Sequence, residues 1–211
     1  MKRMMPRVLA ILWIAVVLAG CNAAGNITNN TAGITPSNPT GKITGNRTSS
    51  TVALTLDMRG NYTGFTELPK DCTMKEAEAA GYLVLHNNVL AAGQEVWDHF
   101  MDTAVQGGDA GIRMAQFFDD EADSPYYIDL FSQNGTYYLF DNTAEIRKKQ
   151  PFSYLLNLTG QIGIPLKDAT FIVLTNDSSL TFADVWKSMI SSDTAVINSI
   201  APHRIVRMLS E

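Results

Sequence analysis

The residues that decide the fold run from Gly111 to Asp141 and read GIRMAQFFDDEADSPYYIDLFSQNGTYYLFD. They form three short runs rich in aromatic and β-branched side chains, separated by residues that favour turns. This pattern is typical of an antiparallel meander. Asn134-Gly135 is the sharpest signal within it, because a two-residue hairpin turn requires positive φ at both central positions.

Side chains in these strands alternate between two faces of the predicted sheet. The apolar face comprises Ile112, Met114, Phe118, Tyr126, Ile128 and Leu130. Arg113, Gln116 and Asp129 fall outside this set. We therefore expect these three polar side chains to be less constrained.

Two segments outside the meander have the periodicity of amphipathic helices. In residues 91–106 the apolar stripe consists of Val96, Trp97, Phe100, Met101, Ala104 and Val105. In residues 178–192 it consists of Phe182, Val185, Trp186, Met189 and Ile190, and either Ser179 or Thr181 can cap the helix. We expect both tryptophans to be buried.

Further strands are predicted at residues 51–58, 82–86, 152–159, 170–175 and 203–209. Residues 170–175 are the most continuously apolar and are expected to be central, whereas 152–159 places Phe152, Tyr154, Leu156 and Leu158 on one face. Thr73 and Glu76 fit a capping box for a short helix that ends at Gly81. Together these elements predict a single α+β domain over residues 51–211, with a mainly antiparallel sheet and the two principal helices packed on one face.

The charge composition argues against nucleic acid and anionic lipid headgroups as binding partners. The chain has 211 residues, 45% of them hydrophobic, and a net charge of −5, which fits one globular domain with an appendage. Its basic residues Lys2, Arg3 and Arg7 precede Cys21, so the chain from Cys21 onward has 13 basic and 21 acidic residues. An acidic domain lacks the electrostatic surface that binds nucleic acid, and anionic lipid headgroups repel it weakly.

Residues 1–20 predict a signal peptide, because a basic start is followed by about a dozen apolar residues, too few for a comfortable bilayer span. Leu18-Ala19-Gly20-Cys21 resembles a bacterial lipobox. The resemblance implies that Cys21 becomes the N-terminus and carries a diacylglyceryl thioether with fatty acyl chains such as palmitate. The chain would then be a lipoprotein anchored to the cell membrane, on its extracytoplasmic face. A plain secretory signal is the alternative.

Residues 21–50 contain the lipidated cysteine and a tether rich in Asn, Thr, Gly and Ser, which cannot bury enough apolar area to fold. A flexible tether of this length has a root-mean-square reach of roughly 30 Å. If Cys21 is acylated, Cys72 has no partner for a disulfide within the chain. A catalytic role for Cys72 is disfavoured, because no arrangement of His or Asn around it resembles a thiol enzyme.

The strongest candidate binding residues are the four carboxylates of the predicted hairpin turn, Asp119, Asp120, Glu121 and Asp123. Crowded carboxylates attract Ca²⁺, although this run lacks the glycine spacing of a calcium loop and is equally consistent with a solvated turn. Weaker candidates are Glu95, His99 and Asp102 on one helix flank, His86 with Asn87 and Asn88 at a strand end, and a platform of Tyr126, Tyr127, Tyr137 and Tyr138. No metal site, cofactor or catalytic residue is assigned, because no established nucleotide, hydrolase or metal motif occurs.

Several segments resemble a domain of unknown function found in small lipoproteins of Gram-positive, spore-forming bacteria. They are KEA at 75–77, GYLVLHNN at 81–88, VWDHF at 96–100, IRMAQF at 112–117, DDEADSPYYIDLF at 119–131 and YLFDN at 138–142. In that family a glycine follows the histidine of the lead-in and another lies in the acidic turn. Here Asn87 takes the first position, and residues 120–125 lack the second. The resemblance covers about 70 residues and implies an architecture and a location, with no catalytic residues to transfer.

These observations favour a non-enzymatic module that binds a small ligand or an envelope protein near the membrane. The alternative is an extracytoplasmic enzyme, such as a hydrolase, with an unrecognised site. Inhibition of an envelope enzyme is a special case of the binding module, and it would use the turns at 119–125 or Asn134-Gly135.

Overall fold

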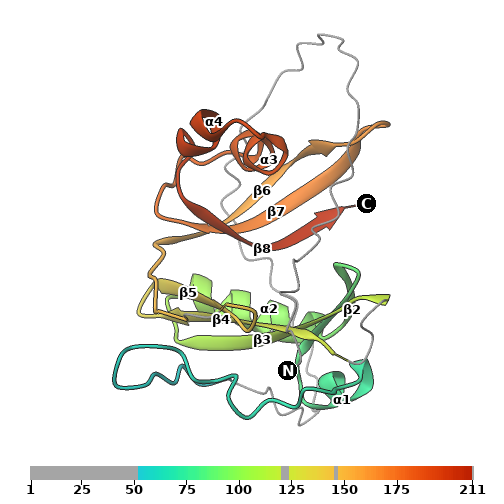
Figure 1. The fold of residues 1–211 in the computed structure, drawn as a ribbon, viewed down its shortest axis with the longest axis vertical. Coiled ribbons are helices and arrows are strands. Elements are labelled where there is room, and N and C mark those ends of the chain that lie inside the picture. The colour runs from blue at the N-terminus through green and yellow to red at the C-terminus, as the bar shows by residue number, and fades with distance from the viewer. Residues whose placement is uncertain (1–51, 120–123, 145–146, 211) are drawn as a thin grey trace, which may run out of the picture. The chain divides into compact units, whose positions relative to one another are not determined.

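The computed structural model describes residues 52–119, 124–144 and 147–210 (Figure 1). The signal peptide, Cys21, the tether and residues Asp120, Glu121 and Asp123 therefore lie outside the described residues. The elements are α1 (Met74–Ala79), β1 (Leu83–His86), β2 (Val89–Ala92), α2 (Gln94–Val105), β3 (Ala110–Phe117), β4 (Tyr126–Gln133), β5 (Thr136–Asp141), β6 (Tyr154–Ile162), β7 (Lys167–Thr175), α3 (Phe182–Ile190), α4 (Thr194–Asn198) and β8 (His203–Ser210). Helices and antiparallel-dominated sheets together confirm the predicted α+β class. None of these helices is long and apolar enough to cross a membrane.

The described strands form two sheets rather than one, with strand orders β2-β1-β3-β4-β5 and β6-β7-β8. All neighbouring strands are antiparallel except β1 and β3, which are parallel. The predicted meander is confirmed as β3-β4-β5. Its second turn has φ of 51° at Asn134 and 73° at Gly135, as a tight hairpin requires.

Strand β3 is buried along nearly its whole length, because both faces of the five-stranded sheet are covered. On one face, Ile112 and Met114 pack with Phe100 of α2. On the other, Ala115 packs with Tyr62, which belongs to the irregular segment that precedes β1. The expectation that Arg113, Gln116 and Asp129 are less constrained is wrong, since all three are buried. Arg113 and Asp129 lie on the second face, which residues 52–82 cover. Gln116 shares the face of Ile112 and Met114, and its side-chain amide donates to the Phe117 carbonyl.

The structure corrects two predicted boundaries. Residues 52–58 form only an isolated bridge between Leu56 and Tyr62, because the chain reverses at once around Asp57, whose carboxylate accepts hydrogen bonds from the amides of Arg59 and Asn61. The helix predicted from residue 91 begins at Gln94, after the unpredicted strand β2. Gly93 separates the two with φ of 86°, at a point where a Cβ would lie 2.6 Å from a neighbouring carbonyl oxygen. The predicted capping box of Thr73 and Glu76 is confirmed.

In the three-stranded sheet, β7 is central, as predicted, and α3 packs on one face. Thr181 caps α3 through a capping box with Asp184. Of the face predicted for residues 152–159, Leu156 and Leu158 pack toward α3, whereas Phe152 joins the core around α2 and Tyr154 is exposed. Helix α4 was not predicted.

Helix α2 packs against side chains of both sheets, because its core cluster also contains Ile172, Leu174 and Val206. Trp97 is buried, as expected, whereas Trp186 is only partly buried against Phe171. The predicted helix stripes are too wide at their ends, since Val105 and Ile190 are exposed.

Candidate functional site

The acidic turn begins beside the ends of two parallel strands. Strands β1 and β3 are in register, with His86 opposite Phe117, so the residues that follow each strand emerge at the same edge of the sheet. Asp119 follows β3 and contacts the β1 end, where His86 Nε2 lies 2.7 Å from Asp119 Oδ1 and Asn87 Nδ2 donates to Oδ2 at 2.9 Å. Asn87 takes a positive φ of 48°, which turns the chain there.

The Asp119 side chain is 77% exposed, so its carboxylate is open to solvent on one side and held by His86 and Asn87 on the other. The hydrogen bond from Asn87 and that from His86 lower the pKa of Asp119 below its usual value of 3.8. Asp119 is thus a fixed negative group at the sheet edge, suited to binding a cationic partner. The other three predicted carboxylates, at 120, 121 and 123, lie outside the described residues.

Of the weaker sequence candidates, His86 and Asn87 contact Asp119, whereas the others are not brought together. Within residues 52–119, 124–144 and 147–210, no group of three or more His, Cys, Asp or Glu side chains is placed to hold a metal ion. The flank of Glu95, His99 and Asp102 is exposed on α2. Asn88 is an exposed turn residue with a positive φ of 67°.

The four tyrosines also fail to make one platform. Tyr127 is buried, and Tyr137 and Tyr138 pack against different core clusters. Tyr126 contacts the edge of Phe118.

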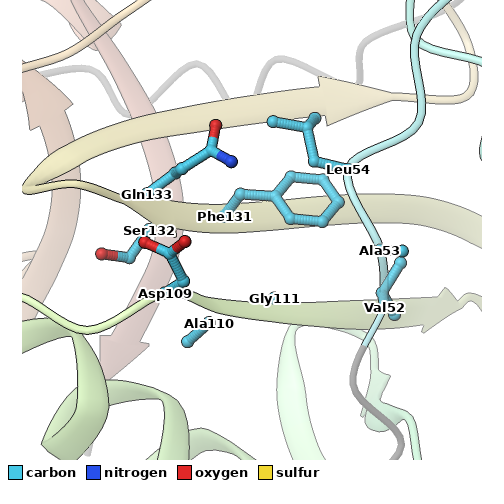
Figure 2. Close-up of a pocket in the computed structure, with 9 residues that line it drawn as sticks. All are labelled: Val52, Ala53, Leu54, Asp109, Ala110, Gly111, Phe131, Ser132 and Gln133. Carbon is cyan, nitrogen blue, oxygen red and sulfur yellow. The ribbon is translucent and has the colours of Figure 1, made fainter.

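A shallow cavity of about 180 Å³ lies where the described chain begins (Figure 2). It is lined by Val52, Ala53, Leu54, Asp109, Ala110, Gly111, Phe131, Ser132 and Gln133. Gly111 permits this close approach of two chain segments, because a Cβ there would lie 2.4 Å from the Val52 carbonyl oxygen. The polar groups at its rim already have partners: Asp109 accepts from the amide of Asn134, and Gln133 accepts from Lys149. Because these two polar side chains are already engaged, the cavity would contact a ligand mainly through its apolar lining.

Sequence reasoning missed a buried ionic cluster beneath residues 52–82. Arg113 and Asp129 are directly opposite each other in the β3–β4 register. Arg113 Nε donates to Asp129 Oδ1 at 2.8 Å, and its Nη2 donates to Oδ2 at 2.6 Å. The same Oδ2 accepts from the Tyr62 hydroxyl at 2.6 Å, and Arg113 Nη2 also donates to the Gly64 carbonyl at 2.9 Å. The pair therefore fastens the covering segment to the sheet.

Aromatic rings complete this cluster around the guanidinium of Arg113. The rings of Phe65 and Tyr82 each lie 5.5 Å from it, within the range of cation–π attraction. Burial raises the pKa of Asp129, and the hydrogen bonds from Arg113 and Tyr62 oppose that rise. Because these groups satisfy one another and Asp129 is fully buried, their role is structural.

Cys72 belongs to the same region and is buried in the apolar cluster with Tyr62 and Tyr127. The buried Tyr127 hydroxyl has no hydrogen-bond partner among the described residues, and burial raises its pKa. A buried thiol in apolar surroundings is unreactive. Cys72 is therefore a core residue.

One serine–histidine contact was also missed. Ser188 Oγ lies 3.2 Å from His203 Nε2, while His203 Nδ1 lies 2.9 Å from the Ala201 carbonyl oxygen. Ser188 also donates to the Val185 carbonyl, one helical turn back, at 2.7 Å. A hydroxyl has a single proton, so donation to the helix carbonyl competes with donation to His203. The only sequence signal for this contact was the position of His203 at the start of a predicted strand.

Comparison of the chain with protein-family models, with curated proteins and with solved structures gives no match.

Proposed function

We propose that the chain is an extracytoplasmic lipoprotein, anchored to the cell membrane through lipid on Cys21, and that its domain is a non-enzymatic binding module. The observation that carries the location is Leu18-Ala19-Gly20-Cys21 after an uninterrupted apolar run. A leucine and two small residues before cysteine, at the end of a signal sequence, resemble the pattern at which lipoprotein processing takes place.

The location is tested by replacing the acylated side chain. A Cys21→Ala variant should leave the membrane fraction, whereas a Cys72→Ala variant, which removes the other cysteine, should remain there. Retention of the Cys21→Ala variant in the membrane to the level of the unaltered chain would exclude the lipid anchor.

The binding role is supported by how the fold uses its polar groups. The buried charges of Arg113 and Asp129 are used to hold the covering segment, and Cys72 is enclosed in apolar surroundings. Asp119, in contrast, is fixed and exposed at a sheet edge, at the start of a run of four carboxylates. We assign this edge as the contact surface for a cationic group of an envelope protein or small ligand.

Capture from intact cells tests this surface. The informative variant neutralises the turn, with D119N, D120N, E121Q and D123N combined. The matched control neutralises four exposed carboxylates elsewhere, with E67Q, D71N, E78Q and D102N combined. Covalent capture of envelope proteins should fall in the first variant and be unchanged in the second. Equal capture by both variants would contradict the assignment.

The alternative, an extracytoplasmic hydrolase, has one observation in its favour, the contact between Ser188 and His203. Its partial burial and the competing hydrogen bond from Ser188 to the helix carbonyl weigh against a nucleophile. A fluorophosphonate probe distinguishes the two readings, because it modifies activated serines. We expect no labelling; labelling that disappears in a Ser188→Ala variant would establish the enzyme.

A further inference from the structure

The two sheets have four outer strands, and three of them carry features that prevent pairing with another chain. Strand β2 has four residues. Strand β8 contains Arg204 and Arg207 and an irregular register opposite β7. Strand β5 is covered at Tyr137, whose N–H and C=O both form hydrogen bonds with Phe152.

Strand β6 has none of these features. It has nine residues, contains no charge and no proline, and keeps an uninterrupted register with β7. Among the described residues the β6 backbone pairs with β7 alone, so the hydrogen-bonding groups of its other edge have no strand partner there. A long, uncharged outer strand is a template for a further strand.

We propose that β6 pairs with β6 of a second copy of this chain, antiparallel about a two-fold axis near Leu158. Two-fold pairing uses the same surface on both copies. Two copies of this chain repel each other in general, because each has a net charge of −5. The β6 strand has no charged residue, so two β6 strands can pair without like-charge repulsion between them. The product is one antiparallel sheet of six strands, in the order β8-β7-β6-β6-β7-β8.

Exposed apolar side chains at both ends of β6 support the antiparallel arrangement. The turn after β6 exposes Ile164 and Leu166, which are 74% and 66% accessible, and Tyr154 at the start of β6 is 40% accessible. With the axis at the middle of β6, the turn of each copy lies beside the Tyr154 end of the other. Apolar groups that are exposed in one copy therefore meet at both ends of the pairing.

The structure offers a matched pair of variants for the test. Thr159 on β6 and Leu209 on β8 both lie beside Thr170 of β7, at opposite edges of the same sheet, and both are exposed. We expect the full chain in density-matched detergent to sediment as a dimer. Thr159→Lys should weaken the dimer at least about tenfold, because the two lysines become like-charged diagonal neighbours across the axis on one face of the sheet. Leu209→Lys should leave the dimer unchanged.

A cross-link tests the geometry independently of the charge variants. In the proposed register Asn157 of one copy lies opposite Thr159 of the other, so the N157C/T159C variant should form a disulfide-linked dimer under mild oxidant. The unaltered chain, with Cys72 buried, is the control. The proposal would be overturned if the chain were a monomer at about 100 µM or if the cross-link did not form. It would also be overturned if Leu209→Lys abolished the dimer and Thr159→Lys did not. Cross-linking of β6 to a different protein would overturn the choice of a second copy.

Discussion

Replacing Asp129 by Asn tests whether the buried ionic cluster holds residues 52–82 to the sheet. The substitution keeps the shape of the side chain but removes the charge that accepts three hydrogen bonds, two from Arg113 and one from Tyr62. Asp129 is fully buried and Arg113 is 7% exposed, so the guanidinium would be left buried without its counter-charge. Removing one partner of such a pair costs about 3–5 kcal/mol of unfolding free energy.

Related variants separate the contributions of the Tyr62 hydrogen bond and of the unpaired charge to the loss of stability. Tyr62→Phe removes one hydrogen bond to a charged group and should cost about 1.5–3 kcal/mol. The double variant R113M/D129L removes both charges, so it should lose much less stability than Asp129→Asn alone. Asp168→Asn is the surface control, because that exposed carboxylate accepts a hydrogen bond only from Gln161 among the described residues, and it should change stability by less than about 0.5 kcal/mol.

Urea unfolding followed by tryptophan fluorescence measures these differences as shifts of the midpoint, with the slope checked for constancy. Hydrogen exchange adds a local measurement, since amides that contact residues 52–82 should lose protection first. A cost below about 1 kcal/mol for Asp129→Asn would show that the charge of Asp129 does not hold residues 52–82 to the sheet. Equal costs for Asp129→Asn and R113M/D129L would also contradict this role, because the penalty would then not come from the unpaired charge.

Three further outcomes follow from the described contacts. Trp97→Ala should cost about 3–5 kcal/mol in urea unfolding, and Trp186→Ala less, because Trp97 is buried and Trp186 only partly so; a reversed order would contradict the packing. Asn87→Ala should raise the pKa of Asp119 toward 3.8 in an NMR titration, because the hydrogen bond from Asn87 is the largest cause of the lowered pKa. The stability that the ionised Asp119 contributes is present above pH 3.8 and is lost as the pH falls through the lowered pKa. An unchanged titration would show that Asn87 does not hold the carboxylate. Thr181→Ala should cost about 1 kcal/mol, since it removes the side-chain cap of α3, whereas Ser179→Ala should cost less than about 0.5 kcal/mol; equal costs would contradict the capping assignment.

Sequence reasoning succeeded where a signal is local. The turn at Asn134-Gly135 and the capping box at Thr73 depend on a few adjacent residues, and both are confirmed. Alternation in 111–141 identified three strands because each is long enough to show the period.

Sequence reasoning failed where segments far apart in the sequence determine the burial and the contacts of a side chain. Strand alternation leaves Arg113 and Asp129 less constrained, because the segment that covers them lies about 50 residues earlier in the chain. The contact of Asp119 with His86 depends on the parallel pairing of β1 and β3, whose connection contains helix α2. A helix between two predicted strands is the signal from which that pairing, and hence the site at the sheet edge, is predictable.

We propose that Cys21 carries the lipid that anchors the chain to the membrane. Mass spectrometry of the N-terminal peptide from the mature protein tests it most directly. We expect the peptide to begin at Cys21 and to carry the added mass of a diacylglyceryl group, with or without a further acyl chain. A mature N-terminus at another residue, or an unmodified cysteine at position 21, would contradict the account.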